Sequence, residues 1–260
     1  MSDLVILTWL WQQTPARHDL GVETVNRWAA QVRAHVTVPH RLAVVSRMSG
    51  FDSGIEVIEP PGFFEDLEVA TWRQRHGAPQ CYRRLAIYHP DAARIFGAEW
   101  ILQLDVDMIA IRSLDPIIER RDADFRILQG TTARWPYNGS MQYLRAGSRP
   151  RVFERFASDP VGVATAARKM YVGSDQAVIP FVLGSHERTF TEHEGVYCYS
   201  SKMVQASTFR SPPAGMRAMF FPGEAKPWNS KVRQGWIKDA WFGTRTTYDT
   251  TGRATSAPML

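Results

Sequence analysis

The stretch Trp100-Ile-Leu-Gln-Leu-Asp-Val-Asp107 decides the fold class. Residues 100–104 form an apolar run of the length of a buried strand, and two carboxylates follow it directly. The pattern therefore places Asp105 and Asp107 at the carboxyl end of a strand, the edge at which open α/β sheets bind their ligands. Two carboxylates in this arrangement can hold a hard divalent cation of the kind that phosphate-handling sites use.

Strands and helices alternate on the N-terminal side of this stretch. Residues 4–8, 41–46 and 55–58 are predicted strands, and residues 22–36 place apolar side chains on one face of a helix. A further helical segment covers residues 81–87, and Pro90 is expected to begin a short second helix. This order predicts an α/β protein with a mostly parallel, mixed sheet flanked by helices.

The alternation is less regular on the C-terminal side. Residues 124–128, 140–144 and 217–221 are predicted strands, and residues 149–157 and 173–183 are predicted helices. No repeat or linker divides the chain, so residues 1–243 are expected to form one domain. Residues 244–260 are rich in Thr, Ser, Arg and Pro, and we expect them to form a flexible tail.

Composition narrows the class of protein. The 260 residues are 44% hydrophobic and 22% charged, which excludes wholesale disorder. No apolar run reaches the length of about 18 residues that a membrane span requires, and the start lacks a signal-peptide pattern. Cys81 and Cys198 have no metal-binding or disulfide-framework spacing. A cytoplasmic protein is therefore predicted. The net charge of +5 suits phosphate-bearing ligands, nucleic acid or plain solubility.

Three other segments carry polar groups suited to a sugar phosphate. In residues 221–228, Gly223 permits close backbone approach and Lys226 offers a point charge for a diphosphate, although an ordinary turn with a surface lysine is the alternative. Residues 137–140 and 173–176 offer Asn, Asp and Gln side chains to sugar hydroxyls. The alternative is structural: residues 137–140 would form an ordinary turn, and Ser174 would cap the helix that follows it. A second Asp-x-Asp pair, Asp122 and Asp124, lies in a charged segment and is expected to be solvated.

The order of these motifs resembles the family 8 retaining glycosyltransferases, the group of glycogenin and the bacterial lipooligosaccharide galactosyltransferases. The resemblance runs from about Leu4 to Trp228 and is most specific in Gly223-Glu-Ala-Lys-Pro-Trp228. It implies a single GT-A, Rossmann-like domain. It also implies transfer of a sugar from a nucleoside-diphosphate sugar, with a UDP-sugar as the expected donor, to a hydroxyl acceptor, with retention of configuration and assistance from Mn2+ or Mg2+.

The resemblance also implies roles for individual residues. Asp105 would contact the nucleotide ribose or the cation, and Asp107 would be the main metal ligand. The remaining roles concern the donor: Arg84 would touch its sugar or phosphate, Asn138, Asp175 and Gln176 would lie at its sugar, Gly223 and Lys226 would hold its β-phosphate, and Thr8 and Trp9 would line its nucleotide.

Two positions depart from the family pattern. Phe220 stands six residues before Lys226, where family members usually have a histidine that serves as a third metal ligand. The segment Asn138-Gly-Ser140 replaces the usual order of Asn, then Ser or Ala, then Gly. The first departure predicts either that another group or water completes the coordination or that the metal binds more weakly.

Two alternatives stay open on the sequence. The acceptor could be a hydroxylated DNA base, for which the Arg-rich residues 73–84 and 145–155 would supply charge. The chain could also be a non-catalytic module that binds sugar or nucleic acid and has lost its metal site, as Phe220 would allow. No Ser/His/Asp elbow, phosphate-binding P-loop or dinucleotide fingerprint is present, which counts against hydrolase, ATPase and dinucleotide-binding functions.

Overall fold

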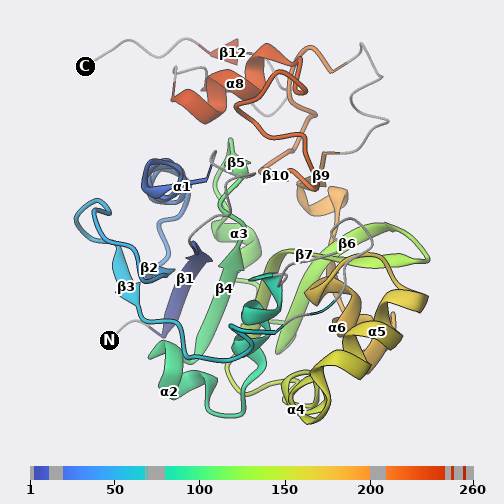
Figure 1. The fold of residues 1–260 in the computed structure, drawn as a ribbon. Helices are drawn as coiled ribbons and strands as arrows, with labels where there is room; N and C mark the ends of the chain where they lie inside the picture. Colours follow the sequence, from blue (N-terminus) through green and yellow to red (C-terminus); the bar gives the residue numbers. More distant parts are fainter. Residues whose placement is uncertain are drawn as a thin grey trace.

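A computed structural model describes residues 3–11, 20–67, 69, 80–199, 209–243, 247–248 and 254–255 of the chain. Seven strands form a large sheet: β1 (Leu4–Trp9), β2 (Arg41–Val45), β3 (Glu56–Ile58), β4 (Trp100–Leu104), β6 (Phe125–Thr132), β7 (Trp135–Arg145) and β8 (Thr189–Phe190). Three more form a small sheet: β5 (Met108–Ala110), β9 (Val196–Cys198) and β10 (Ala218–Phe220). The strand orders are β3-β2-β1-β4-β7-β6-β8 and β5-β10-β9 (Figure 1).

The large sheet changes its direction of growth between β1 and β4. β1 pairs in parallel with β2 on one side and with β4 on the other, and β2 pairs in parallel with β3. β7 is antiparallel to both β4 and β6, so it alone of these strands runs against the rest. The space beyond the carboxyl ends of β1 and β4 is therefore the topological switch point, where open α/β sheets bind ligands. The predicted mixed, mostly parallel sheet is confirmed.

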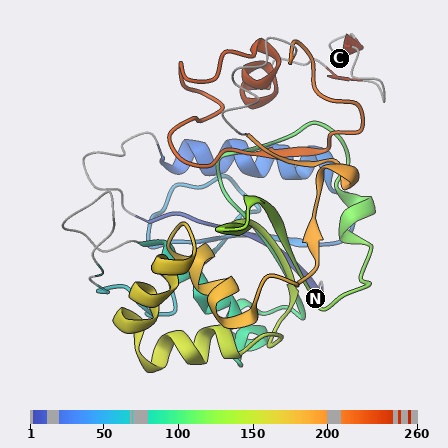
Figure 2. The same ribbon diagram turned by 90° about the vertical axis from the view of Figure 1, so that its right-hand side faces the viewer.

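Helices cover both faces of this sheet. The described helices are α1 (Val22–His35), α2 (Ala92–Phe96), α3 (Asp115–Ile118), α4 (Arg151–Ser158), α5 (Pro160–Met170), α6 (Asp175–Leu183), α8 (Gly235–Phe242) and the 3-10 helices η1 (Gln80–Tyr88) and η2 (Glu192–Glu194). Figure 2 shows α1 on one side of the sheet and α4, α5 and α6 on the other, with α8 beyond the small sheet.

The side chains of β1 explain why both faces need cover. All six residues of the strand are buried, and successive side chains point to opposite faces. Val5 and Leu7 pack in the cluster that contains η1, α2, α4 and α6, whereas Leu4 and Ile6 pack in the cluster that contains α1. Burial of each such side chain is worth about 1.5–3 kcal/mol, so two covering layers are required to bury the strand.

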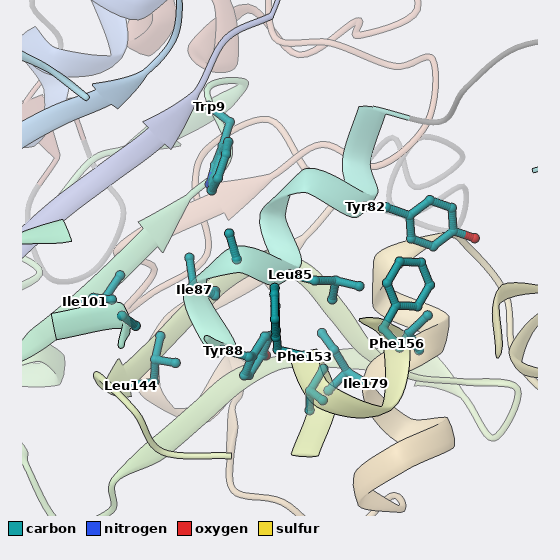
Figure 3. Close-up of a cluster of buried hydrophobic side chains, with 14 of the residues drawn as sticks. Trp9, Tyr82, Leu85, Ile87, Tyr88, Ile101, Leu144, Phe153, Phe156 and Ile179 are labelled. Carbon is teal, nitrogen blue, oxygen red and sulfur yellow. The ribbon is translucent and has the colours of Figure 1, made fainter. Parts of the chain in front are cut away.

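The 3-10 helix η1 forms the middle of the first cluster. Figure 3 shows its residues Leu85, Ile87 and Tyr88 between the strands and the helices. Tyr82, at the start of η1, stacks on Phe156 of α4 with ring centroids 4.9 Å apart and planes inclined by 22°. These contacts fix η1 against the sheet.

β10 lies between two apolar clusters. Phe220 packs in the cluster shared with α1, whereas Met219 and Phe221 point to the other side and pack with Trp236 and Trp241 of α8. The small sheet therefore joins α8 to the main body, and it brings the chain after Phe220 to the switch point.

Several sequence predictions need correction. The strands predicted at residues 124–128 and 140–144 are parts of a longer hairpin, β6 and β7, and the helix α5 was not predicted. The helical segment around residues 81–87 is a 3-10 helix. Pro90 precedes the cap residue Asp91 instead of lying in the first turn of α2. The length of the hairpin depends on the pairing of β6 with β7, which local periodicity does not reveal.

The predicted tail lies largely outside the described residues. Two short strands within it, β11 (Thr247–Tyr248) and β12 (Ala254–Thr255), pair antiparallel, so this part of the tail is hydrogen-bonded and not structureless. The division into a domain of residues 1–243 and a tail stays a prediction. Among the described helices, none combines the length and apolar character needed to cross a bilayer.

Replacing Trp28 tests the two-layer account. Trp28 in α1 is fully buried, so Trp28→Ala should lower the free energy of unfolding by about 3–5 kcal/mol in urea denaturation. Val57 in β3 is 48% exposed, and Val57→Ala should change it by less than about 0.5 kcal/mol. Equal losses in the two variants would contradict the assignment of α1 as a covering layer.

Candidate functional site

Polar side chains gather beyond the carboxyl ends of β1 and β4. Asp105 follows β4 directly, and its backbone N–H donates to the Ser140 carbonyl of β7 over 2.8 Å. Asp107 follows two residues later, immediately before β5. Burial raises the pKa of Asp107, and the negative charge of Asp105 raises it further, so the two carboxylates interact and belong to one site. The sequence prediction that both lie at this edge is confirmed.

Arg84 of η1 joins this edge to α6. One guanidinium nitrogen, Nη1, pairs with Asp105 Oδ1, and the other, Nη2, lies 2.8 Å from Asp175 Oδ2. The side chain of Arg84 is 11% exposed and that of Asp175 is 2% exposed. Burial alone would lower the pKa of Arg84, but the charges of Asp105 and Asp175 raise it well above its usual value. Arg84 is therefore a permanent cation between two carboxylates.

A buried chain of hydrogen bonds supports Asp105 from below. The Tyr88 hydroxyl donates to Gln142 Oε1, Gln142 Nε2 donates to Gln103 Oε1 over 2.7 Å, and Gln103 Nε2 lies 3.4 Å from Asp105 Oδ1. Burial raises the pKa of Tyr88 well above its usual value, so the hydroxyl keeps the proton that it donates to Gln142. Asp105 Oδ1 accepts at the other end, so the Gln103 amide donates to it and the chain has one direction. Sequence reasoning missed it, although two glutamines within apolar strands were a visible signal.

Lys226 is the second cation of the site. Its Nζ pairs with Asp107 Oδ2 and donates to the Phe221 carbonyl over 3.0 Å. The side chains of Lys226 and Asp107 are 17% and 10% exposed. Burial raises the pKa of Asp107, and the nearby positive charge of Lys226 opposes that rise.

The loop that carries Lys226 is anchored at both ends. It leaves β10 through Gly223, whose φ of +72° favours glycine. Farther along, Asn229 Nδ2 donates to the Glu224 carbonyl over 2.7 Å. Trp228 packs on Trp241 of α8 with ring centroids 4.8 Å apart. The backbone around Lys226 is thus held between β10 and α8.

The segment of Asn138, Gly139 and Ser140 corrects a sequence prediction. It is not a turn between strands but an irregularity inside β7, where the register with β6 shifts between Ile127 and Leu128. The Asn138 side chain is buried: its Oδ1 accepts from the Ser140 N–H over 2.9 Å, and its Nδ2 donates to Cys198 Sγ over 3.4 Å.

Gly139 lies against the start of α6. Its N–H donates to Gln176 Oε1 over 3.4 Å, and Gln176 Nε2 donates to the Val172 carbonyl over 3.3 Å, so backbone groups orient this amide. Gly173 has a φ of +112°, and a Cβ there would lie 2.4 Å from Gln176 Cγ. Ser174 occupies the cap position without a capping hydrogen bond from its side chain, and its hydroxyl donates to Asp175 Oδ1 over 3.1 Å.

The end of β1 contributes buried groups. Thr8 is 1% exposed, and its Oγ1 has no hydrogen-bond partner among the described residues. Trp9 is 7% exposed and packs edge-on against Phe96 of α2 with ring centroids 6.3 Å apart. The indole therefore lies mainly in the apolar core, beside the site.

The expected position of a third metal ligand is apolar. Phe220 is 1% exposed and pairs in register with Met108, the residue after Asp107. Within the described ranges, no group of three or more His, Cys, Asp and Glu side chains could hold a metal ion. The carboxylates Asp105 and Asp107 are thus the acidic groups that this edge offers to a cation.

The site residues predicted from the sequence form two adjoining groups. Arg84, Asp175 and Gln176 lie around Gly139, and Arg84 also pairs with Asp105. Asp107 pairs with Lys226. Cys81 also lies beside the first group, since the charges of Arg84, Asp175 and Asp105 all influence its pKa, which burial raises. Sequence reasoning did not place Cys81 or Cys198 near the site, because an isolated cysteine carries no spacing signal.

The fold has known counterparts. The galactosyltransferase LgtC, in complex with donor and acceptor sugar analogues, matches with a TM-score of 0.63 and 14% identity over 98% of this chain and 97% of LgtC. A structure of LgtC with a glutamine-to-glutamate mutation in its active site matches with a TM-score of 0.63 and 13% identity over 98% and 97%. The glycosyltransferase GlyE of Streptococcus pneumoniae TIGR4, in its apo form, matches with a TM-score of 0.61 and 9% identity over 94% of this chain and 60% of GlyE.

These likenesses show the fold. The chain has the GT-A glycosyltransferase fold, as the order of motifs in the sequence predicted. No family model and no curated protein sequence matches the chain.

Removal of the Arg84 charge should destabilise the protein. Arg84→Met leaves the buried Asp175 and the partly buried Asp105 without their partner, and we expect the free energy of unfolding to fall by about 3–5 kcal/mol in urea denaturation. The matched control is Arg94→Met, whose partner Asp91 lies 3.5 Å away and is exposed, and which should cost less than about 0.5 kcal/mol. A loss no larger than in the control would show that the buried triad does not hold the site together.

The thiol of Cys198 should be nearly inert. Burial raises its pKa from 9.0 to about 11, so at pH 8 the thiolate fraction is about a hundredfold smaller than in the unfolded chain. We expect iodoacetamide to modify Cys198 at least about a hundredfold more slowly in the native than in the urea-unfolded protein, as followed by peptide mass spectrometry. Similar rates in the two states would contradict its burial behind Asn138.

Proposed function

We propose that the protein is a glycosyltransferase that moves a sugar from a nucleoside-diphosphate sugar, with a UDP-sugar as the expected donor, to a hydroxyl acceptor. The observation that carries the proposal is the convergence of Arg84, Asp105, Asp107, Asp175 and Lys226 at the switch point. The GT-A fold supports it, because LgtC, which matches over nearly its whole length, was captured with donor and acceptor sugar analogues.

The charges of the site favour a divalent cation. Three carboxylates face two cationic side chains there, which leaves one net negative charge. A diphosphate would add further negative charge, which the site can accept only with an additional positive charge. Mg2+ is commonly held by one or two carboxylates together with substrate phosphates, so Asp105 and Asp107 fit such a cation without a third protein ligand.

The bound cation would act as a Lewis acid that stabilises the departing diphosphate. The protein's own contribution in this proposal comes from fixed groups. Lys226 would place its ammonium on the diphosphate, and Arg84 would hold Asp105 and Asp175 in position. Groups that are fixed before the reaction stabilise developing charge without reorganisation, and this electrostatic effect is usually the largest contribution to catalysis.

The groups at Asp175 and Gln176 are relevant to whether the transfer keeps or inverts the configuration of the sugar. Asp175 Oδ2 is held by Arg84, and Gln176 carries an amide that cannot act as a carboxylate nucleophile. The Gln176 amide is oriented by Gly139 and Val172, and LgtC also has a glutamine in its active site. We therefore propose front-face substitution with retention of configuration, in which the leaving diphosphate assists the loss of the acceptor proton.

The acceptor is proposed to be a glycan hydroxyl. Two of the four arginines in residues 145–155 are engaged in ion pairs: Arg145 pairs with Glu99 over 3.0 Å, and Arg149 pairs with Glu187 over 2.8 Å and with Asp124 over 3.0 Å. Residues 73–79, which are most of the other Arg-rich stretch, lie outside the described residues. The structure gives the DNA acceptor no support.

Phe220 is the observation that favours a second candidate, a non-catalytic module that binds sugar nucleotides. Its buried ring supplies no ligand at the position next to Asp107. The two candidates differ in one measurable property, because a transferase slowly hydrolyses its donor when no acceptor is present, whereas a binding module does not turn over.

Hydrolysis of a donor panel tests the proposed function. UDP-, GDP- and CMP-sugars with Mn2+ or Mg2+ are followed by proton NMR, and we expect slow release of sugar from one donor class. Asp107→Asn should lower that rate at least about a hundredfold, since it removes a charged ligand of the cation that would stabilise the departing diphosphate. The matched control is Asp122→Asn in the second Asp-x-Asp pair, where Asp122 is bound to the exposed Arg188, and its rate should stay within about twofold of the unmodified protein.

The result separates the two candidates. Release from no donor in the panel would favour the binding module. Release at the same rate from Asp107→Asn and the unmodified protein would place the reaction elsewhere in the molecule.

A further inference from the structure

The ion pair between Lys226 and Asp107 occupies both groups that the proposed ligands would need. In the proposed function Asp107 binds a cation and Lys226 binds the donor diphosphate, yet in this structure the two side chains form an ion pair with each other. Both are largely buried, so the pair is poorly screened by water. A cation that binds Asp107 must therefore displace the Lys226 ammonium or share the carboxylate with it.

The surroundings of Asp107 make such displacement unfavourable for a cation alone. The neighbouring strand offers the buried ring of Phe220 and no polar ligand. The second carboxylate, Asp105, is already paired with Arg84. A divalent cation that binds without a nucleotide would find both carboxylates already paired. It would also be repelled by the positive charges of Arg84 and Lys226.

The diphosphate alone faces the opposite difficulty. It would add at least two negative charges to a site that already carries one net negative charge. If the cation and the diphosphate bound together, Asp107 would hold the cation in place of Lys226, and the ammonium of Lys226 would be available to the phosphates. Each ligand removes the electrostatic cost of the other.

We propose that Lys226 acts as an internal counter-ion that guards Asp107 in the nucleotide-free protein, and that it transfers to the donor diphosphate when a divalent cation takes its place. This inference rests on the proposed function and adds to it a coupling between cation and nucleotide. The transfer needs rotation of one side chain, because the loop backbone is anchored by Trp228 on Trp241 and by Asn229 on Glu224. A lysine side chain has a flexible four-carbon stem that can make such a movement.

The test measures Mn2+ binding to the full-length protein by electron paramagnetic resonance, which reports the free ion, in the absence and presence of saturating UDP. In the unmodified protein, we expect UDP to strengthen Mn2+ binding at least about tenfold. Lys226→Met removes the guarding charge but keeps a side chain of similar length. This variant should bind Mn2+ without UDP about tenfold more tightly than the unmodified protein, and its UDP-dependent gain should largely disappear.

The neighbouring lysine of the same loop supplies the matched control. Lys231 pairs with Glu224 and not with Asp107, so Lys231→Met should leave both Mn2+ affinities unchanged. Lys226→Gln is a second variant without the charge, measured by thermal unfolding and by the same Mn2+ titration. It shows whether an effect of Lys226→Met comes from the lost charge or from a folding defect. Equal Mn2+ affinity with and without UDP in the unmodified protein would overturn the inference. Nucleotide-free binding that is not strengthened in either Lys226 variant would overturn it as well.

The inference and the proposed function fail in different ways. Donor hydrolysis that depends on Mn2+, together with no effect of Lys226→Met on nucleotide-free Mn2+ binding, would reject the guarding role and leave the glycosyltransferase proposal standing. Stronger Mn2+ binding in Lys226→Met, together with no hydrolysis of any donor, would support the guarding role and reject the catalytic proposal.

Discussion

The guanidinium of Arg84 joins three separate parts of the fold at one buried point: η1, which carries it, the end of β4 and the start of α6. Each of these parts reaches the point for its own reason. η1 is packed into the core through Tyr82 and Leu85, and β4 is fully buried between two layers. Since a buried carboxylate without a partner is strongly unfavourable, Asp175 and the partly buried Asp105 favour the arrangement that keeps their elements beside η1.

The second half of the site depends on how β10 alternates between two clusters. Phe220 faces the main core and Phe221 faces α8, so the chain that follows must leave the sheet beside Asp107. This path delivers Lys226 to its carboxylate, with a hydrogen bond to the Phe221 carbonyl as a second anchor. A phenylalanine at position 220 thus fits the packing of the strand well. The positive charge beside Asp107 comes from Lys226.

The fold and the residues at the switch point could be predicted from the sequence, because apolar runs show where strands end and the order of the motifs along the chain resembles that of a known family. Asp105 and Asp107 are examples, since a buried strand precedes them. Local patterns do not specify partners. The pair of Lys226 with Asp107 spans 119 positions, and the link from Gln103 to Gln142 depends on the antiparallel register of β4 and β7. Such pairs appear only when the strands are assembled.

The central claim is that a nucleoside diphosphate binds beyond the ends of β1 and β4. A crystal structure with a non-hydrolysable UDP-sugar and Mn2+ tests it most directly. The account predicts the diphosphate between Asp107 and Lys226, with the sugar beside Gly139 and Gln176 and with Lys226 Nζ on a phosphate oxygen. A nucleotide bound at any other surface, or a diphosphate at this edge that touches neither Asp107 nor Lys226, would contradict the account.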